Sequence, residues 1–110
     1  MLEVRVLHQA RRELIESARW YKQQDGLALA RDFGARYREQ LLRARQMPQT
    51  GHLVTGLPPD IDFEVRRFLL ERFPHALFVA RLPDELVVVA IAHQHRKPGY
   101  WHKRLAKVKP

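Results

Sequence analysis

Cysteine is absent from this 110-residue sequence, so neither disulfide bonds nor thiol chemistry contributes to its fold or function. Long apolar stretches are missing as well. The longest one, Leu86 to Ala92, has seven residues, whereas a membrane-spanning helix needs about 20. The N-terminal residues, MLEVRVLHQARRE, lack the apolar core of a secretory signal. We therefore expect a soluble, cytoplasmic protein whose residues 1–110 form a single domain, since domains usually contain about 100–200 residues.

Acidic residues are scarce relative to basic ones. Twelve Asp and Glu residues oppose 20 Lys and Arg residues, which gives a formal net charge of +8. The imbalance is greatest at the C-terminal end, where residues 96–110 contain six Lys or Arg residues and no Asp or Glu. Such an excess favours an acidic partner, either a nucleic acid or an acidic protein, although a solvated basic surface without a partner would have the same composition.

Hydrophobic periodicity predicts a short strand followed by two helices. Apolar residues alternate with charged ones from Leu2 to Val6, as in a half-buried strand. Asp25-Gly26 then separates two amphipathic helices, and Met47-Pro48 ends the second, so we expect an antiparallel helical hairpin. The apolar faces of the two helices are Ala10, Leu14, Ala18 and Tyr21, and then Ala30, Phe33, Tyr37, Leu41 and Ala44.

The second half of the sequence predicts an antiparallel sheet. Residues 48–60 are rich in glycine and proline and indicate a loop. Strand patterns follow at 62–70, 75–82 and 85–95, and a turn from Leu82 to Glu85 joins the last two strands as a hairpin. The last strand is apolar at consecutive positions, which is typical of a central strand covered on both faces. The order β-α-α-β-β-β predicts an α+β fold, in which a helical hairpin packs on one face of a mostly antiparallel four-stranded sheet.

Histidines at the end of the last strand raise the question of a metal site. His93 and His95 are two residues apart and would point to the same face, and His102 could approach them. A zinc site usually has three or four ligands that include thiolates or carboxylates, whereas the neighbours here are the cations Arg96, Lys97, Lys103 and Arg104. Because these repel a divalent ion, we predict no metal, and no cofactor is implied. The remaining histidines are interpreted as ordinary polar residues: His8, His52 and His75.

Three segments together resemble a known superfamily. Residues 13–33, ELIESARWYKQQDGLALARDF, place Trp-Tyr in a helix and Gly-Leu before the next helix. Residues 66–80, RRFLLERFPHALFVA, lead through Arg-Phe-Pro into a strand, and residues 84–101, DELVVVAIAHQHRKPGYW, end a strand with His-x-x-Arg-x-Pro-Gly-Tyr-Trp. In this order they resemble the RelE/ParE superfamily, the toxins of bacterial type II toxin–antitoxin pairs. His75 and Val79 stand where tyrosines are frequent in the superfamily, and Lys97 stands where an acidic residue is common.

The Trp-Tyr helix and the Arg-x-Pro-Gly-Tyr-Trp ending look more like the ParE branch. That resemblance implies a protein that binds and inhibits DNA gyrase without chemistry of its own. It also implies a cognate antitoxin, which neutralises the toxin in a hetero-oligomer. Trp20 and Tyr21 are candidates for the antitoxin surface, although Trp20 could instead pack on the second helix. The candidate gyrase-binding residues are Arg96, Lys97, Tyr100, Trp101, Lys103 and Arg104, with Arg36, Arg43 and Arg45 as further cations. Trp101 has a structural alternative, which is to cover the edge of the sheet.

The RelE branch instead implies a metal-independent ribonuclease that cuts mRNA on the ribosome. Such a reaction needs a base for the 2′-hydroxyl, cations for the phosphate and an acid for the leaving oxygen. The residues able to supply these groups are Arg67, Arg72, Arg81, His95 and Tyr100. Their arginines could equally be solvated or ion-paired on the sheet, with Glu71 or Asp62 as partners of Arg72. A third possibility is a binding module of this fold without toxicity.

Overall fold

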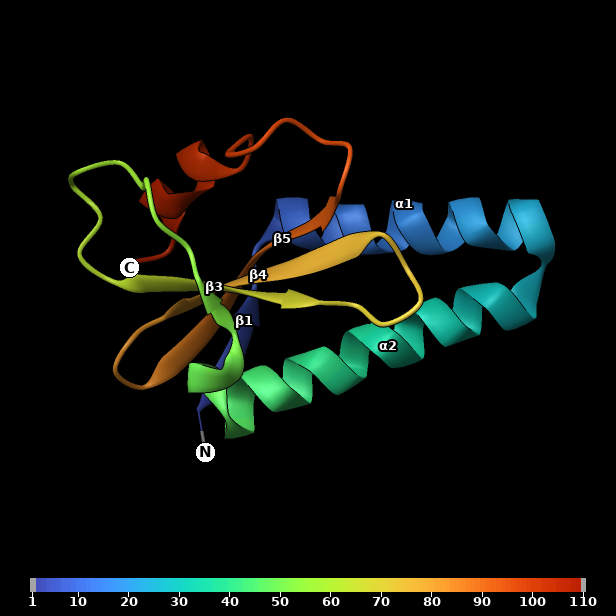
Figure 1. Ribbon diagram of the computed structural model, residues 1–110, viewed down its shortest axis with the longest axis horizontal. Coiled ribbons are helices and arrows are strands. Elements are labelled where there is room, and N and C mark those ends of the chain that lie inside the picture. The colour runs from blue at the N-terminus through green and yellow to red at the C-terminus, as the bar shows by residue number, and fades with distance from the viewer. Residues whose placement is uncertain (1, 110) are drawn as a thin grey trace.

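Two helices and a five-stranded sheet build the computed structural model, which describes residues 2–109 (Figure 1). No helix in this range is long and apolar enough to cross a membrane. In chain order the elements are β1 (Glu3–Val6), α1 (His8–Asp25), α2 (Leu27–Gln46), the 3₁₀ helix η1 (Pro48–Thr50), β2 (His52–Leu53), β3 (Glu64–Leu69), β4 (His75–Arg81), β5 (Glu85–His93) and the 3₁₀ helix η2 (His102–Lys107).

The strands are arranged in the order β1-β5-β4-β3-β2 across the sheet. β1 runs parallel to β5, with Val4 opposite Leu86, and all other neighbouring strands are antiparallel. This arrangement confirms the predicted α+β class and the predicted chain order. The fifth strand, β2, lies in the segment 48–60, for which the sequence indicates only a loop. A strand of two residues is too short to show a hydrophobic period, so sequence patterns could not reveal it.

The helical hairpin turns at Gly26, where the sequence predicts the break. Gly26 has a φ of 86°, a backbone conformation that residues with a side chain avoid, and its N–H donates a hydrogen bond of 2.9 Å to the Lys22 carbonyl oxygen. α2 ends at Gln46, just before Met47-Pro48, as predicted. The residues buried at the centre of the predicted apolar faces are Ala10, Tyr21, Phe33, Tyr37 and Ala44.

β5 lies inside the sheet, between β1 and β4, and is buried on both faces as its sequence predicts, although β4 is the middle strand of the five. None of the residues from Leu86 to Ala92 is more than 7% exposed. One face of the sheet packs against the helices, with α1 in contact with β5. Figure 1 shows η2, drawn in red, on the side of the sheet away from α2. The consecutive apolar residues of β5 are therefore explained by two covering layers.

The face of the sheet that carries Phe78 is called the outer face below. His75, also on β4, contacts Tyr21 and Phe33 of the helices. Phe78 comes three residues later in the strand and therefore points to the opposite side. There its ring packs on Trp101, with 4.7 Å between the ring centroids. The segment that follows β5 thus returns across the outer face and covers it, and two of its apolar residues are fully enclosed: Leu105 and Val108.

Candidate binding site beside the last strand

A cavity of about 640 Å³ opens on the outer face of the sheet. Two small residues line it side by side, Ala76 of β4 and its cross-strand partner Ala92 of β5. Their short side chains leave space above the sheet. Phe78 and Trp101 also line the cavity, and so do Gln94 and residues 96–102 of the segment that follows β5. The hollow therefore lies between the sheet and the basic C-terminal segment.

The lining of this cavity is cationic. Arg67, Arg96 and Lys97 contribute permanent positive charges, and no Asp or Glu is found among the described residues that line it. The Nε atom of Arg67 is buried and has no hydrogen-bond partner within residues 2–109. Four histidines also line the cavity: His52, His75, His93 and His102. Such a lining offers positive charge and hydrogen-bond donors to an anionic ligand.

The histidines at the end of β5 and after it do not gather into a metal site. Within residues 2–109, no group of three or more His, Cys, Asp or Glu side chains could hold a metal ion. The rings of His93 and His95 stack with 5.0 Å between their centroids, and the Nδ1 atom of His93 accepts a hydrogen bond of 3.1 Å from the His95 backbone N–H. His102 instead packs edge-on against Trp101, at 4.7 Å between centroids.

His75 is a core residue, not the ordinary polar residue that the sequence indicates. It is 6% exposed, and the Tyr21 hydroxyl lies 3.5 Å from its Nδ1 atom. Burial, together with the neighbouring His93, lowers the pKa of His75 to about 4. His75 is therefore neutral at pH 7 and adds no charge to the cavity.

Glu13 of α1 ties the C-terminal segment to the sheet. Tyr100 donates a hydrogen bond of 2.5 Å to Glu13 Oε2, and the Arg104 guanidinium donates to both carboxylate oxygens, at 2.8 and 3.1 Å. The side chains of Glu13 and Arg104 are only 14% and 15% exposed. Burial and the hydrogen bond to Glu13 raise the pKa of Tyr100 above its ordinary value. Tyr100 and Arg104 are thus committed to contacts inside the molecule.

The side chains of Glu13 and Arg104 also take the place of a neighbouring strand along part of β5. β1 pairs with β5 only as far as Val88. Beyond it, the Ile91 backbone N–H donates a hydrogen bond of 3.1 Å to Glu13, and Arg104 donates one of 3.1 Å to the Val89 carbonyl oxygen. Buried backbone groups require such partners. No sequence motif singles out Glu13, which looks like any other carboxylate on an amphipathic helix.

Two of the predicted gyrase-binding residues are enclosed, and this corrects their assignment to an external surface. Trp101 is 3% exposed and covers the sheet, which was its structural alternative. Arg104 is neutralised by Glu13. Tyr100 is half-buried, with its hydroxyl on Glu13.

The other three predicted gyrase-binding residues, Arg96, Lys97 and Lys103, are exposed. None of them forms an ion pair within residues 2–109. The Arg96 guanidinium lies 3.9 Å from the centroid of the Tyr100 ring, a cation–π contact that orients it. These three residues are called the basic rim below, and they leave the positive charge of the C-terminal end uncompensated.

The three arginines of α2 that were candidates for further binding cations are instead used within the molecule. Arg43 donates a hydrogen bond of 3.0 Å to the Thr50 hydroxyl, and Arg45 donates one of 2.9 Å to the Leu2 carbonyl oxygen. Arg36 is surrounded by carboxylates. These three side chains are therefore held by contacts within the molecule.

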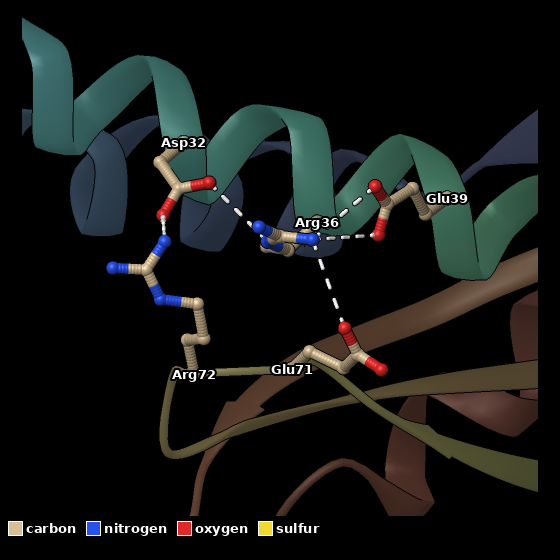
Figure 2. Close-up of polar contacts among 5 residues, drawn as sticks. All are labelled: Asp32, Arg36, Glu39, Glu71 and Arg72. Atoms are coloured by element: carbon tan, nitrogen blue, oxygen red, sulfur yellow. Dashed lines mark hydrogen bonds and ion pairs between the residues drawn. The ribbon is translucent and has the colours of Figure 1, made fainter.

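Figure 2 shows the ion-pair network around Arg36. Its Nε atom lies 3.2 Å from Asp32, outside hydrogen-bond geometry, and its Nη1 atom lies 3.3 Å from Glu39 and 3.7 Å from Glu71. The second oxygen of Asp32 pairs with Arg72 at 2.9 Å. Arg72 has a φ of 69° and sits in the turn between β3 and β4, so the network fastens this turn to α2. Asp32 is the partner of Arg72, rather than either of the two carboxylates that the sequence suggested.

The five residues of the ribonuclease alternative do not converge. Arg67 and Tyr100 line the cavity. Arg72 belongs to the network on α2, and Arg81 ends β4 at the opposite end of that strand from His75. His95 is exposed and does not line the cavity. The arrangement can bind an anion, but it does not bring together the base, cations and acid that were predicted.

The two candidates for the antitoxin surface differ in exposure. Trp20 is 55% exposed on α1, so its packing alternative is wrong. Tyr21 is 8% exposed and is surrounded by Phe33, Phe73 and His75. Only Trp20 of this pair is accessible to a partner.

A helical hairpin on a mostly antiparallel sheet, with a basic segment returning over the outer face, has the architecture of the RelE/ParE superfamily. More specifically, a family model described as the ParE toxin of the type II toxin–antitoxin system, parDE, matches residues 4–98, so the chain belongs to this family. A solved structure titled "Chromosomal ParDE TA system from P. aeruginosa" has the same fold, with a TM-score of 0.66 over 84% of this chain and 96% of that chain. The two sequences are 22% identical. No curated protein sequence matches the chain.

Proposed function

We propose that this chain inhibits bacterial growth by binding DNA gyrase, and that a cognate antitoxin neutralises it in a shared complex. Membership of the ParE toxin family supports the assignment as a type II toxin with an antitoxin partner. Gyrase is the target implied by the ParE branch. Under this proposal residues 1–110 act as one toxin domain in the cytoplasm, and no cofactor is needed.

The observation that carries the proposal is the basic rim. Inhibition by binding requires no titrating group, but it does require exposed cationic anchors that can meet an acidic surface. Arg96, Lys97 and Lys103 are exposed and unpaired within the described chain, and Tyr100 holds Arg96 in place. The separation of the ribonuclease residues also favours binding over RNA cleavage.

A supercoiling assay with purified gyrase tests the target. The wild-type chain should inhibit supercoiling, and replacing the basic rim by glutamine at all three positions should weaken inhibition about 10-fold or more, because charged anchors dominate such interfaces. The matched control replaces Arg11, Arg12 and Arg19, which are exposed on α1, by glutamine. It removes the same charge and should leave inhibition nearly unchanged. Normal supercoiling at excess wild-type protein would eliminate gyrase as the target.

Translating ribosomes test the alternative target. Cuts in mRNA that disappear in Arg67→Ala and His95→Ala, but persist in Arg72→Ala, would replace gyrase inhibition by RNA cleavage. We expect no cuts. Harmless expression in a bacterium that lacks the antitoxin would contradict toxicity of either kind.

A further inference from the structure

We propose that the cavity on the outer face binds an acidic, partly aliphatic peptide segment of the antitoxin. A carboxylate of the segment would pair with Arg67 and Arg96, and an aliphatic side chain would lie over Ala76 and Ala92. The inference rests on the proposed function, because the antitoxin is the partner that it invokes. It adds the chemistry of the bound segment and the place where that segment binds.

Charge complementarity is the first argument for this occupant. Arg66 and Arg67 are neighbours on β3 and point to opposite faces. Arg66 is satisfied within the molecule, since it pairs with Glu64 at 3.1 Å and donates a hydrogen bond of 2.8 Å to the Gly51 carbonyl oxygen. Arg67 lies in the cavity with its Nε atom buried and unpartnered within residues 2–109. A buried N–H group without a partner is costly, so a carboxylate from outside would supply what the described chain lacks there.

The apolar part of the cavity defines the rest of the segment. The floor of Ala76 and Ala92 is hollow and apolar, which suits a branched aliphatic side chain. Leu69, which also lines the cavity, is 63% exposed. β3 continues to Leu69, but β2 pairs only with Arg66 and Arg67. An extended peptide that lies along this end of β3 could contact apolar surface and pair with backbone groups that have no strand neighbour.

The aromatic residues argue for a peptide over a single-stranded nucleic acid. Proteins that bind single strands stack bases on free aromatic faces. Here the largest ring is covered, and a second is occupied by cations. Trp101 is 3% exposed against Phe78, and the Tyr100 ring has Arg96 at 3.9 Å and Arg104 at 5.2 Å from its centroid. The positive charge therefore remains accessible, while the Trp101 ring does not.

Occupation of the cavity would also explain how the antitoxin silences the toxin. Arg96 and Lys97 line the cavity and belong to the basic rim as well. A carboxylate bound between Arg67 and Arg96 would remove Arg96 from the surface offered to gyrase. The antitoxin segment and gyrase would then compete for the same cations.

Fluorescence of Trp101 provides a direct readout. It lines the cavity, and the second tryptophan, Trp20, is exposed on α1 and can be replaced by phenylalanine. The probes are the peptide acetyl-Asp-Leu-Glu-Leu-Asp-amide and its neutral counterpart with Asn and Gln in place of the acids. The acidic peptide should give a saturable change in emission, and the neutral one should bind about 10-fold or more weakly, the effect of losing charge-assisted hydrogen bonds.

Two arginine variants locate the binding site. Arg67→Gln should weaken the acidic peptide about 10-fold or more, whereas Arg19→Gln, an equal loss of charge on α1, should not. Arg96→Gln, in the exposed segment after β5, should also weaken binding and keeps the test valid if Arg67→Gln fails to fold. Equal affinity of the two peptides, unchanged affinity in both cavity variants, or no saturable change up to about 1 mM peptide would overturn the inference.

The outcomes separate this inference from the proposed function. Peptide binding is measured without gyrase, so a bound peptide with normal supercoiling would remove gyrase and keep the cavity assignment. Supercoiling inhibition without peptide binding would keep gyrase as the target and remove the cavity assignment. A six-nucleotide uridine RNA that displaces the peptide and binds more tightly than it would assign the cavity to nucleic acid, which would also overturn the inference.

Discussion

At the scale of single residues, the exposed cations were predictable and their internal partners were not. A run of positive charge without carboxylates indicates solvent exposure, which holds for Arg96, Lys97 and Lys103. Tyr100 and Arg104 belong to the same run, but they find Glu13 87 and 91 residues away along the chain. Contacts over such distances depend on the packing of α1 against β5. Local sequence patterns carry no information about them.

Glu13→Ala should lower the free energy of unfolding by about 3 kcal/mol, because it leaves Arg104 nearly buried without its partner and the Ile91 N–H unsatisfied. Glu16→Ala, one turn along α1, is the matched control, since its side chain is 64% exposed. It should change stability by less than about 0.5 kcal/mol. Urea denaturation followed by circular dichroism measures both. Similar losses in the two variants would show that the Glu13 network contributes little.

His75 should make the protein less stable in mild acid. Its pKa is about 4 in the folded chain and near 6.5 when unfolded, so the unfolded chain takes up this proton first as the pH falls. Stability is therefore lost between pH 6.5 and about 4, by about 3 kcal/mol in total. His75→Phe should flatten this part of the pH profile in urea denaturation, whereas His8→Phe, at an exposed position, should not. An unchanged profile in His75→Phe would assign the acid sensitivity to other groups.

At the scale of elements, long periodic segments were predictable and short ones were not. The helices, their break at Gly26 and the fully buried β5 follow from hydrophobic period and turn chemistry. β2 and η2 have too few residues for a period, and they form because neighbouring elements hold them. The start of β2 illustrates this dependence. Gly51 lies against the ring of Phe68, where a side chain would collide.

Gly51→Ala should destabilise the protein by about 2 kcal/mol, since its Cβ atom would overlap the buried Phe68 ring. Gly56→Ala is the comparison in the same loop. Gly56 has a φ of 73° but open space around it, so alanine there costs about 1 kcal/mol through backbone conformation alone. Thermal unfolding of both variants gives the difference. A smaller effect at Gly51 than at Gly56 would mean that β2 shifts freely away from β3.

At the scale of the whole molecule, the segment after β5 carries exposed cations that have no ion-pair partner within residues 2–109. Arg36, Arg43 and Arg45 of α2 contact carboxylates, a hydroxyl and a carbonyl oxygen, whereas the basic rim has no such partners within residues 2–109. Charge placement thus made the basic end predictable from the sequence. The cavity was not, because it requires Ala76 beside Ala92 and Arg67 from a third strand, a juxtaposition that only the sheet register creates.

Inhibition of gyrase should depend strongly on salt. Raising NaCl from about 50 to about 300 mM screens exposed charges and should weaken inhibition several-fold, because the Debye length shortens from about 14 to about 6 Å. The variant without the basic rim should lose most of this dependence. Supercoiling assays at matched gyrase activity in each salt provide the measurement. An equal salt response in the variant would locate the electrostatic contact elsewhere on the molecule.

Beyond Val88, the backbone of β5 is hydrogen-bonded by two charged side chains where a neighbouring strand would otherwise pair. This arrangement also protects the molecule against self-assembly. An open strand edge is a template for another copy of the same sheet, and natural proteins blunt such edges with charge. Glu13 and Arg104 occupy the hydrogen-bonding groups of β5 beyond Val88. A chain that lost this pair would expose an unpaired apolar strand end, which could pair with the same strand of another molecule. We expect such a chain to aggregate and precipitate.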